Sequence, residues 1–186
     1  ALLNWDNWVL YQMCQGAGVY PFKQHSAEEM KKVEATAFKW FKNAKFVTES
    51  EVEANNALIN REIDFYVCGG NYTASPPRRE GRLEVEAVTP RKGAMKDGAG
   101  GIVWMELTNV INNPKPSPLA DDFLAYLQEP DVAYLVAMAD STHNPVANMS
   151  DPRVFKKFSK NDLLSIQWDA LEEDLNYCED YAENPE

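Results

Sequence analysis

The chain has 186 residues and a formal net charge of −11, with an isoelectric point of about 4.7. This length suits one domain, or one and a half lobes of a two-lobed protein, and 45% apolar residues are enough for a core. The acidic balance argues against nucleic-acid partners, whose phosphates need Lys and Arg, and it allows a cationic ligand.

Several classes of site have no signature in the sequence. The three cysteines form no CxxC pair, and there are only two histidines, which argues against a zinc site. The acidic run after residue 170 lacks the spacing of a calcium loop and is interpreted as a solvated face. No nucleophile elbow, HExxH, P-loop or dinucleotide fingerprint is present. We therefore expect no metal, no cofactor and no enzymatic activity.

The N-terminal third predicts a strand end followed by helices. "ALLN" reads as the end of a strand, and "WDNWVLYQMCQGAG" as a helix stopped by its glycines. Ser26 and Glu29 have the spacing of a capping box and predict the start of a long helix. Thr48 and Glu51 repeat that spacing and predict a second capped helix.

Short apolar segments follow in the middle of the chain. "IDFYVC" (63–68) predicts a strand, and the alternation of "LEVEAVTP" (83–90) predicts a half-exposed one. "RKGAMKDGAGG" (91–101) is a glycine-rich loop and a candidate hinge. "IVWMELTNVI" (102–111) predicts a further strand.

The last third predicts mainly helix. "LADDFLAYLQ" and "EPDVAYLVAMAD" read as two short helices, with Pro130 at a helix N-terminal position. Residues 161–186 read mainly as helix. Helices alternating with short apolar strands indicate an α/β class, in which three or four strands leave the sheet incomplete.

Two aromatic and acidic clusters are candidate binding sites for a cation. Trp104 and Glu106 lie two residues apart on a predicted strand, so both face the same side. An indole face attracts an ammonium group, and a carboxylate adds a charge-assisted hydrogen bond. Trp5, Asp6 and Trp8 form a second cluster at a strand-to-helix junction, the place where open α/β sheets bind ligands. Taken alone, either cluster also fits core tryptophans beside a surface or helix-capping acid.

Segments 100–106 ("GGIVWME") and 129–137 ("EPDVAYLVA") resemble, in order and spacing, the C-terminal half of the periplasmic spermidine/putrescine-binding proteins of ABC transporters. The N-terminal and C-terminal segments resemble further parts of that half. The resemblance implies a partial fold of the type II periplasmic-binding-protein kind. It implies a lobe-two-like α/β segment over 1–98, a returning lobe-one-like strand and helices over 99–160, and a C-terminal helix region over 161–186.

The resemblance also implies site residues and a function. Trp104 matches the family's stacking Trp, and Glu106 its amine-binding Asp. Asp6 matches an acid at the other end of the polyamine, and Gln167 a ligand-binding Gln. The implied function is binding of a small cationic solute, such as putrescine or spermidine, for uptake by an ABC permease. The implied location is periplasmic or secreted, although the N-terminal segment lacks the basic region of a signal peptide.

An alternative is an interaction or structural module derived from this fold, with a degenerate pocket. Val9 stands where the family has an acid, Cys68 lies near the position of a second pocket Trp, and the family's proteins are about twice as long. The chain is then a fragment, the partner of another chain, or a homodimer that covers its open edges.

Overall fold

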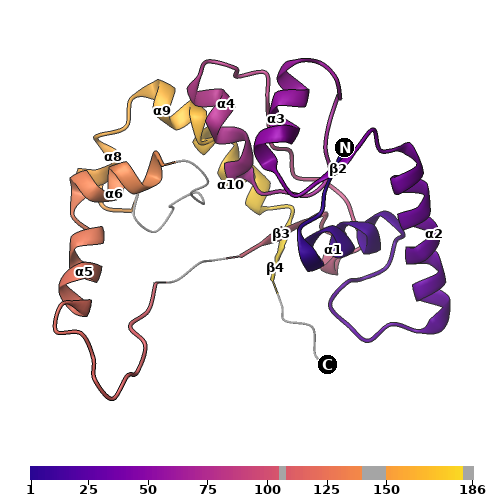
Figure 1. Cartoon of the computed structure of the whole chain (residues 1–186), viewed down its shortest axis with the longest axis horizontal. Helices are drawn as coiled ribbons and strands as arrows, with labels where there is room; N and C mark the ends of the chain where they lie inside the picture. The colour runs from indigo at the N-terminus through magenta and orange to yellow at the C-terminus, as the bar shows by residue number, and fades with distance from the viewer. Residues whose placement is uncertain (105–107, 140–149, 182–186) are drawn as a thin grey trace.

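The computed structural model describes residues 1–104, 108–139 and 150–181, and Figure 1 shows the arrangement of its elements. Its helices are α1 (Asp6–Gly16), α2 (Ala27–Asn43), α3 (Glu51–Ile59), η1 (Asn71–Ala74), α4 (Ser75–Arg79), η2 (Lys96–Gly98), α5 (Ala120–Leu127), α6 (Pro130–Ala137), α8 (Pro152–Phe155), α9 (Lys160–Ser165) and α10 (Trp168–Leu175). Its strands are β1 (Leu2–Leu3), β2 (Val47–Thr48), β3 (Gly101–Val103) and β4 (Cys178–Asp180).

The described strands form two small parallel sheets. β1 pairs with β2, and β3 pairs with β4. A parallel bridge joins Leu2 to Val67, so β1 is the middle of three parallel segments. Mixed helix and short parallel strand confirms the broad α/β class.

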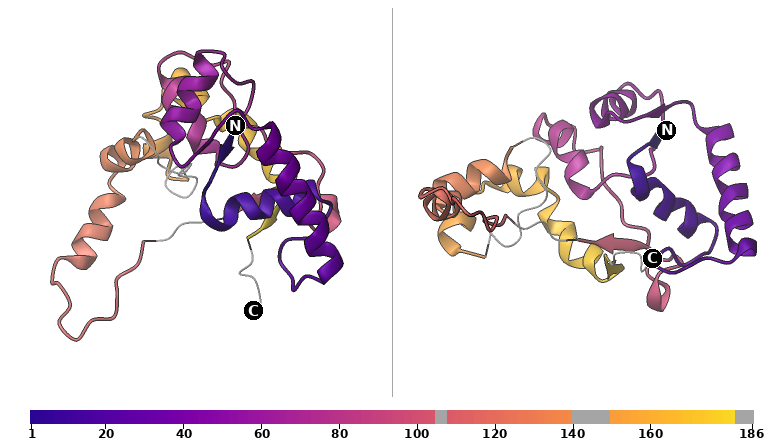
Figure 2. Two further views of the ribbon diagram at one scale, coloured as in Figure 1. Left: turned by 45° about the vertical axis from the view of Figure 1, so that its right-hand side comes forward. Right: turned by 60° about the horizontal axis from the view of Figure 1, so that its bottom comes forward.

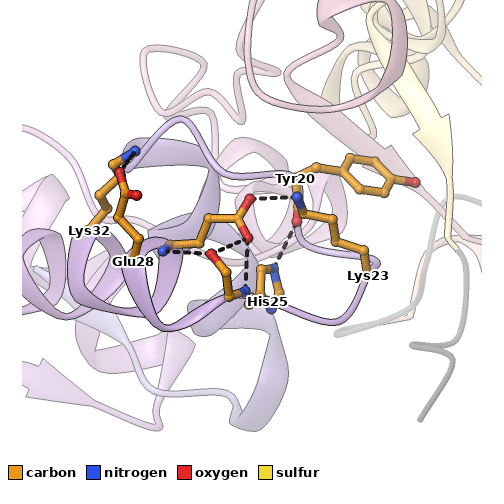
Figure 3. Close-up of polar contacts among 7 residues, drawn as sticks. Tyr20, Lys23, His25, Glu28 and Lys32 are labelled. Carbon is orange, nitrogen blue, oxygen red and sulfur yellow. Dashed lines mark hydrogen bonds and ion pairs between the residues drawn. The ribbon is translucent and has the colours of Figure 1, made fainter.

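The N-terminal helices follow the local signals of the sequence. α1 ends at Gly16, before Gly18 adopts a φ of 69°. The Ser26 and Glu29 side chains form the predicted capping box of α2, and Figure 3 shows the polar contacts around this helix start. The first core cluster joins β1, α1 and α2 through buried apolar side chains of Leu2, Val9, Met13, Cys14, Val19 and Val33.

The predicted cap of α3 is wrong by two residues. Ser50, rather than Thr48, is the N-cap, and its hydroxyl accepts from the Glu53 amide. The Thr48 hydroxyl instead contacts the Glu53 carboxylate at 2.5 Å and accepts from the Ser50 amide. Thr48 is the last residue of β2, and its extended backbone moves the helix start to Ser50.

The predicted strand over 83–90 is not formed, because buried side chains make hydrogen bonds to its backbone N–H and carbonyl groups. The Arg78 guanidinium donates to the carbonyls of Leu83 and Val85 at 2.8 and 3.0 Å. The Gln167 amide binds both the N–H and the carbonyl of Ala87. Alternating apolar residues predicted a strand here, but this segment pairs with none of the described strands, and buried side chains make its hydrogen bonds instead.

Two further strand predictions are only partly met, and two strands, β2 and β4, were missed. Within 63–68, Val67 alone makes a bridge to β1. Within 102–111, β3 ends at Val103; the backbone over 108–111 is irregular, and Ile111 is 82% exposed. The C-terminal region forms α9 and α10, but Cys178–Asp180 is a strand paired with β3 rather than helix.

The helices α5, α6 and α8 lie at the edge of the molecule farthest from α2 (Figures 1 and 2). α5 and α6 match the predicted helices, with Pro130 at the first position of α6. A second core cluster joins α6 and α8 to the C-terminal helices through Ala133, Ala137, Val154, Phe158 and Ile166. Within the described ranges, no helix combines the length and apolar character that a bilayer-spanning segment requires.

Candidate functional site

A pocket of about 500 Å³ opens at the carboxyl ends of the three parallel segments. Its lining residues are Asn4, Trp5, Trp8, Glu49 and Tyr72. Asn4 and Trp5 follow β1 directly, Glu49 follows β2 directly, and Tyr72 comes five residues after the bridge at Val67. Ligands of open α/β sheets bind at this edge.

The rings of Trp5 and Tyr72 both line the pocket and are stacked nearly parallel to each other. Their centroids lie 6.4 Å apart and their planes differ by 9°. The Trp5 indole N–H donates to the Glu49 carbonyl at 3.0 Å, which ties the end of β1 to the end of β2. Both rings are half-buried.

Trp104 extends this aromatic surface from the second sheet. Its ring lies 4.8 Å from that of Trp8. The turn at Gly69–Gly70 admits it, because a Cβ on Gly70 would lie 2.5 Å from the Tyr72 ring and 3.1 Å from the Trp104 ring. Only glycine therefore fits at position 70 without moving these rings. The structure brings together Trp5, Trp8 and Trp104, the tryptophans of both predicted clusters.

The C-terminal strand contributes a further ring. The Tyr181 amide donates to the Val103 carbonyl at 2.8 Å, and its ring lies 5.2 Å from Trp8. Burial, and then the hydrogen bond with Tyr181, raises the pKa of Tyr11 to about 12. Tyr11, whose ring lies 5.8 Å from that of Trp8, thus stays neutral.

Of the two predicted acidic residues, one begins a helix and the other lies outside the described residues. α1 begins at Asp6, so this residue stands at the junction beside the pocket. Glu106 lies outside the described residues. Glu49, which lines the pocket, is exposed, and its carboxylate makes no ion pair within the described part of the chain.

Gln167 lies away from the aromatic pocket and binds the main chain. Its side chain is 5% exposed, and the amide takes both polar groups of Ala87, accepting at 2.8 Å and donating at 3.0 Å. Its own backbone is left-handed, with a φ of 53°, at the start of α10. Both ends of its amide are therefore used to hold 83–90 in place.

The glycine-rich loop over 91–101 is bonded to two distant parts of the fold. The Gln15 amide accepts from Ala94 N–H at 2.9 Å and donates to the Gly100 carbonyl at 2.6 Å. The Glu179 carboxylate accepts from the Lys96 amide at 2.7 Å and pairs with its ammonium at 3.2 Å. These bonds fix the start of β3, and hence the position from which Trp104 projects.

Sequence reasoning missed Glu49 and Tyr72. A signal existed for both, since each follows a short apolar segment, at "FVT" and "FYVC". The sequence alone does not show that these two segments lie beside β1. Among the described residues, no three His, Cys, Asp or Glu side chains converge as a metal-binding group.

Among the side chains that the structure describes, the pocket offers aromatic faces and the Glu49 carboxylate, groups that can attract a cation. The chain matches no protein-family model, no curated protein and no solved structure.

Proposed function

We propose that this protein binds a small organic cation in the pocket at the carboxyl ends of β1 and β2. The observation that carries the proposal is the convergence of three tryptophans and Tyr72 around that pocket, with Glu49 in its lining. Indole faces attract cations by about 0.5–2 kcal/mol, depending on desolvation. A carboxylate supplies the charge-assisted partner.

The resemblance noted in the sequence extends this proposal to a polyamine such as putrescine or spermidine. The fold is then a partial relative of the type II periplasmic binding proteins, acting with an ABC permease in the periplasm or outside the cell. Trp104 faces the ligand, while Glu106 and Asp6 take its ammonium groups. In this proposal Gln167 acts indirectly, because its amide is bonded to Ala87.

The carboxylates give the most direct test. Glu106→Gln and Glu49→Gln keep the shape of each side chain and remove its charge, so each is expected to weaken putrescine binding by about 1.5–3 kcal/mol in titration calorimetry. Glu34→Gln is the matched control, since Glu34 is exposed on α2 and does not line the pocket. Unchanged affinity in both Glu106→Gln and Glu49→Gln, or no heat with any amine, contradicts the proposal.

A second proposal, homodimeric assembly through the retained fold with a degenerate pocket, is supported by a separate observation. Large apolar side chains on α5 and α6 and just before α5 are between 56% and 65% exposed, namely Leu119, Phe123, Tyr126 and Leu135. Several exposed large apolar side chains on two consecutive helices are typical of an interaction site. This proposal requires no ligand.

A further inference from the structure

Residues 108–119, the proline loop, project from the body of the protein just before α5 (Figure 1). All of them are exposed, and none belongs to a helix or strand. Prolines stand at 114, 116 and 118, and the chain bends at Pro114 and Lys115. Because proline has a fixed φ, a loop rich in it loses less conformational freedom on binding than an ordinary loop. Lys115 therefore stands at the bend of a projecting and restricted loop.

Lys115 is an isolated positive charge. It is the only Lys or Arg between Lys96 and Arg153, in a chain whose net charge is −11. Its ammonium makes no ion pair with any residue that the structure describes. The loop thus presents a single cation to its surroundings, and the partner that this cation lacks is a carboxylate.

The pocket at the carboxyl ends of β1 and β2 offers the complementary groups. Glu49 is exposed, and among the described residues its carboxylate has no ion pair. Trp5, Trp8 and Tyr72 line the same pocket. Aromatic-lined grooves are the surfaces on which proline-rich segments dock, and indole faces also attract an ammonium. The pocket thus matches both the lysine of the proline loop and its flanking prolines.

We infer that the pocket of one chain receives the proline loop of a second copy, with the Lys115 ammonium paired to the Glu49 carboxylate. This inference rests on the proposed cation site and names its partner. The loop comes from another copy, because within one chain it extends away from α1 and β2 (Figure 1). It ends at Leu119, one of the exposed apolar side chains of the second proposal, so the two contacts are continuous along the chain.

A charge exchange tests the pairing in the whole chain. Glu49→Lys places a positive charge at both sides of the contact, and Lys115→Glu places a negative charge at both, so copies of either variant repel one another there. A mixture of the two variants has opposite charges at both contacts. In sedimentation equilibrium we expect the mixture to associate about tenfold more tightly than either variant alone.

Glu34→Lys is the matched control, since Glu34 is exposed on α2 and does not line the pocket. Mixed with Lys115→Glu, it is expected to give no gain in association over the single variants. A gain equal to that of Glu49→Lys would show that net charge alone drives the association, and it would overturn the inference.

A peptide of residues 108–120 tests the loop apart from the rest of the second copy. The receptor is the whole chain with Lys115→Gln, whose own loop no longer competes. In titration calorimetry we expect the peptide to bind about tenfold more tightly than its Lys115→Gln form. Replacing Pro114 and Pro116 of the peptide by Ala is expected to weaken binding about threefold, because the flexible segment loses more freedom on docking.

The outcomes separate this inference from the proposed function. Equal association of the mixture and the single variants, or equal binding of the two lysine and glutamine peptides, overturns the loop inference, and putrescine binding by the wild type then leaves the cation site standing. Association of the mixture without putrescine binding supports the loop and removes the small-solute function. Thermal unfolding of each variant checks that it is folded, and the peptide supplies the test if Glu49→Lys is not.

Discussion

At the scale of single residues, Arg78 has a larger influence on the fold than its position in a short helix indicates. It is 7% exposed, and its guanidinium donates to the carbonyls of Leu83, Val85 and Leu164. The bonds to Leu164 cap the carboxyl end of α9, and the others set the path of 83–90. One side chain thus joins α4, α9 and the segment 83–90.

Replacing Arg78 by Met is expected to lower the free energy of unfolding by roughly 3–5 kcal/mol, because three carbonyls lose their donor at a buried site. The measurement is the urea midpoint at constant slope. Arg82→Met is the control, since Arg82 is exposed and pairs with Glu84 in solvent, and its effect is expected to stay below about 1 kcal/mol. Equal effects of the two substitutions would show that the Arg78 hydrogen bonds add nothing to the free energy of unfolding.

Residue-level prediction from sequence succeeded where the signal is local. The Ser26–Glu29 box spans three residues, and its geometry is decided within one helical turn. The contact of Trp8 with Trp104 depends on the pairing of β3 with β4 and on the turn at Gly70. No pattern near either tryptophan encodes that contact, so each was recognised only as part of a separate cluster.

At the scale of elements, the start of α2 has a pH-dependent stability. The pKa of Glu29 is lowered from 4.5 to about 2, chiefly by the hydrogen bond from the Lys23 ammonium at 2.5 Å and then by those from Ser26. The unfolded chain binds this proton near pH 4.5, whereas the folded chain resists it until about pH 2. The stabilisation is therefore complete above pH 4.5 and lost as the pH falls toward 2.

Melting temperatures measured from pH 7 to pH 2 test this linkage. The difference between wild type and Glu29→Gln is expected to be constant above about pH 5 and to shrink toward pH 2. Glu28→Gln, at an exposed position that pairs only with Lys32 among described residues (Figure 3), is expected to give a flat difference. A wild-type advantage over Glu29→Gln that persists unchanged at pH 2 would contradict the assignment.

Element types were predictable where a local signal marks the helix start, as the capping box does for α2 and Pro130 does for α6. The segment 83–90 has the alternation of a strand, yet Arg78 and Gln167 satisfy its backbone. β4 is the opposite case, a strand that the sequence did not predict. Its residues "CED" carry little apolar signal, and they form a strand because they pair with β3. Pairing decided both cases, and pairing is not a local property.

At the scale of the whole molecule, the exposed apolar surface of α5 and α6 predicts self-association. If the second proposal holds, sedimentation equilibrium is expected to give a mass above the 21.1 kDa of one chain. Phe123→Lys is expected to return the mass to that of one chain, because it places a charge among the exposed apolar side chains. Phe38→Lys, at a 70% exposed position on α2, is expected to leave the association unchanged. A single-chain mass at every concentration would remove the support for assembly.

The pairing of β3 with β4 also sets an order of events during synthesis. β1 and β2 are separated by fewer than fifty residues, so the ribosome delivers both early, together with Trp5, Trp8 and Glu49. β3 must wait for the residues of β4, which at about 5–20 residues per second arrive roughly 4–15 s later. Until then β3 has no partner strand, and the bonds from Glu179 to Lys96 and from Tyr181 to Val103 are not yet made. A chaperone that binds aromatic segments has its longest opportunity during this interval.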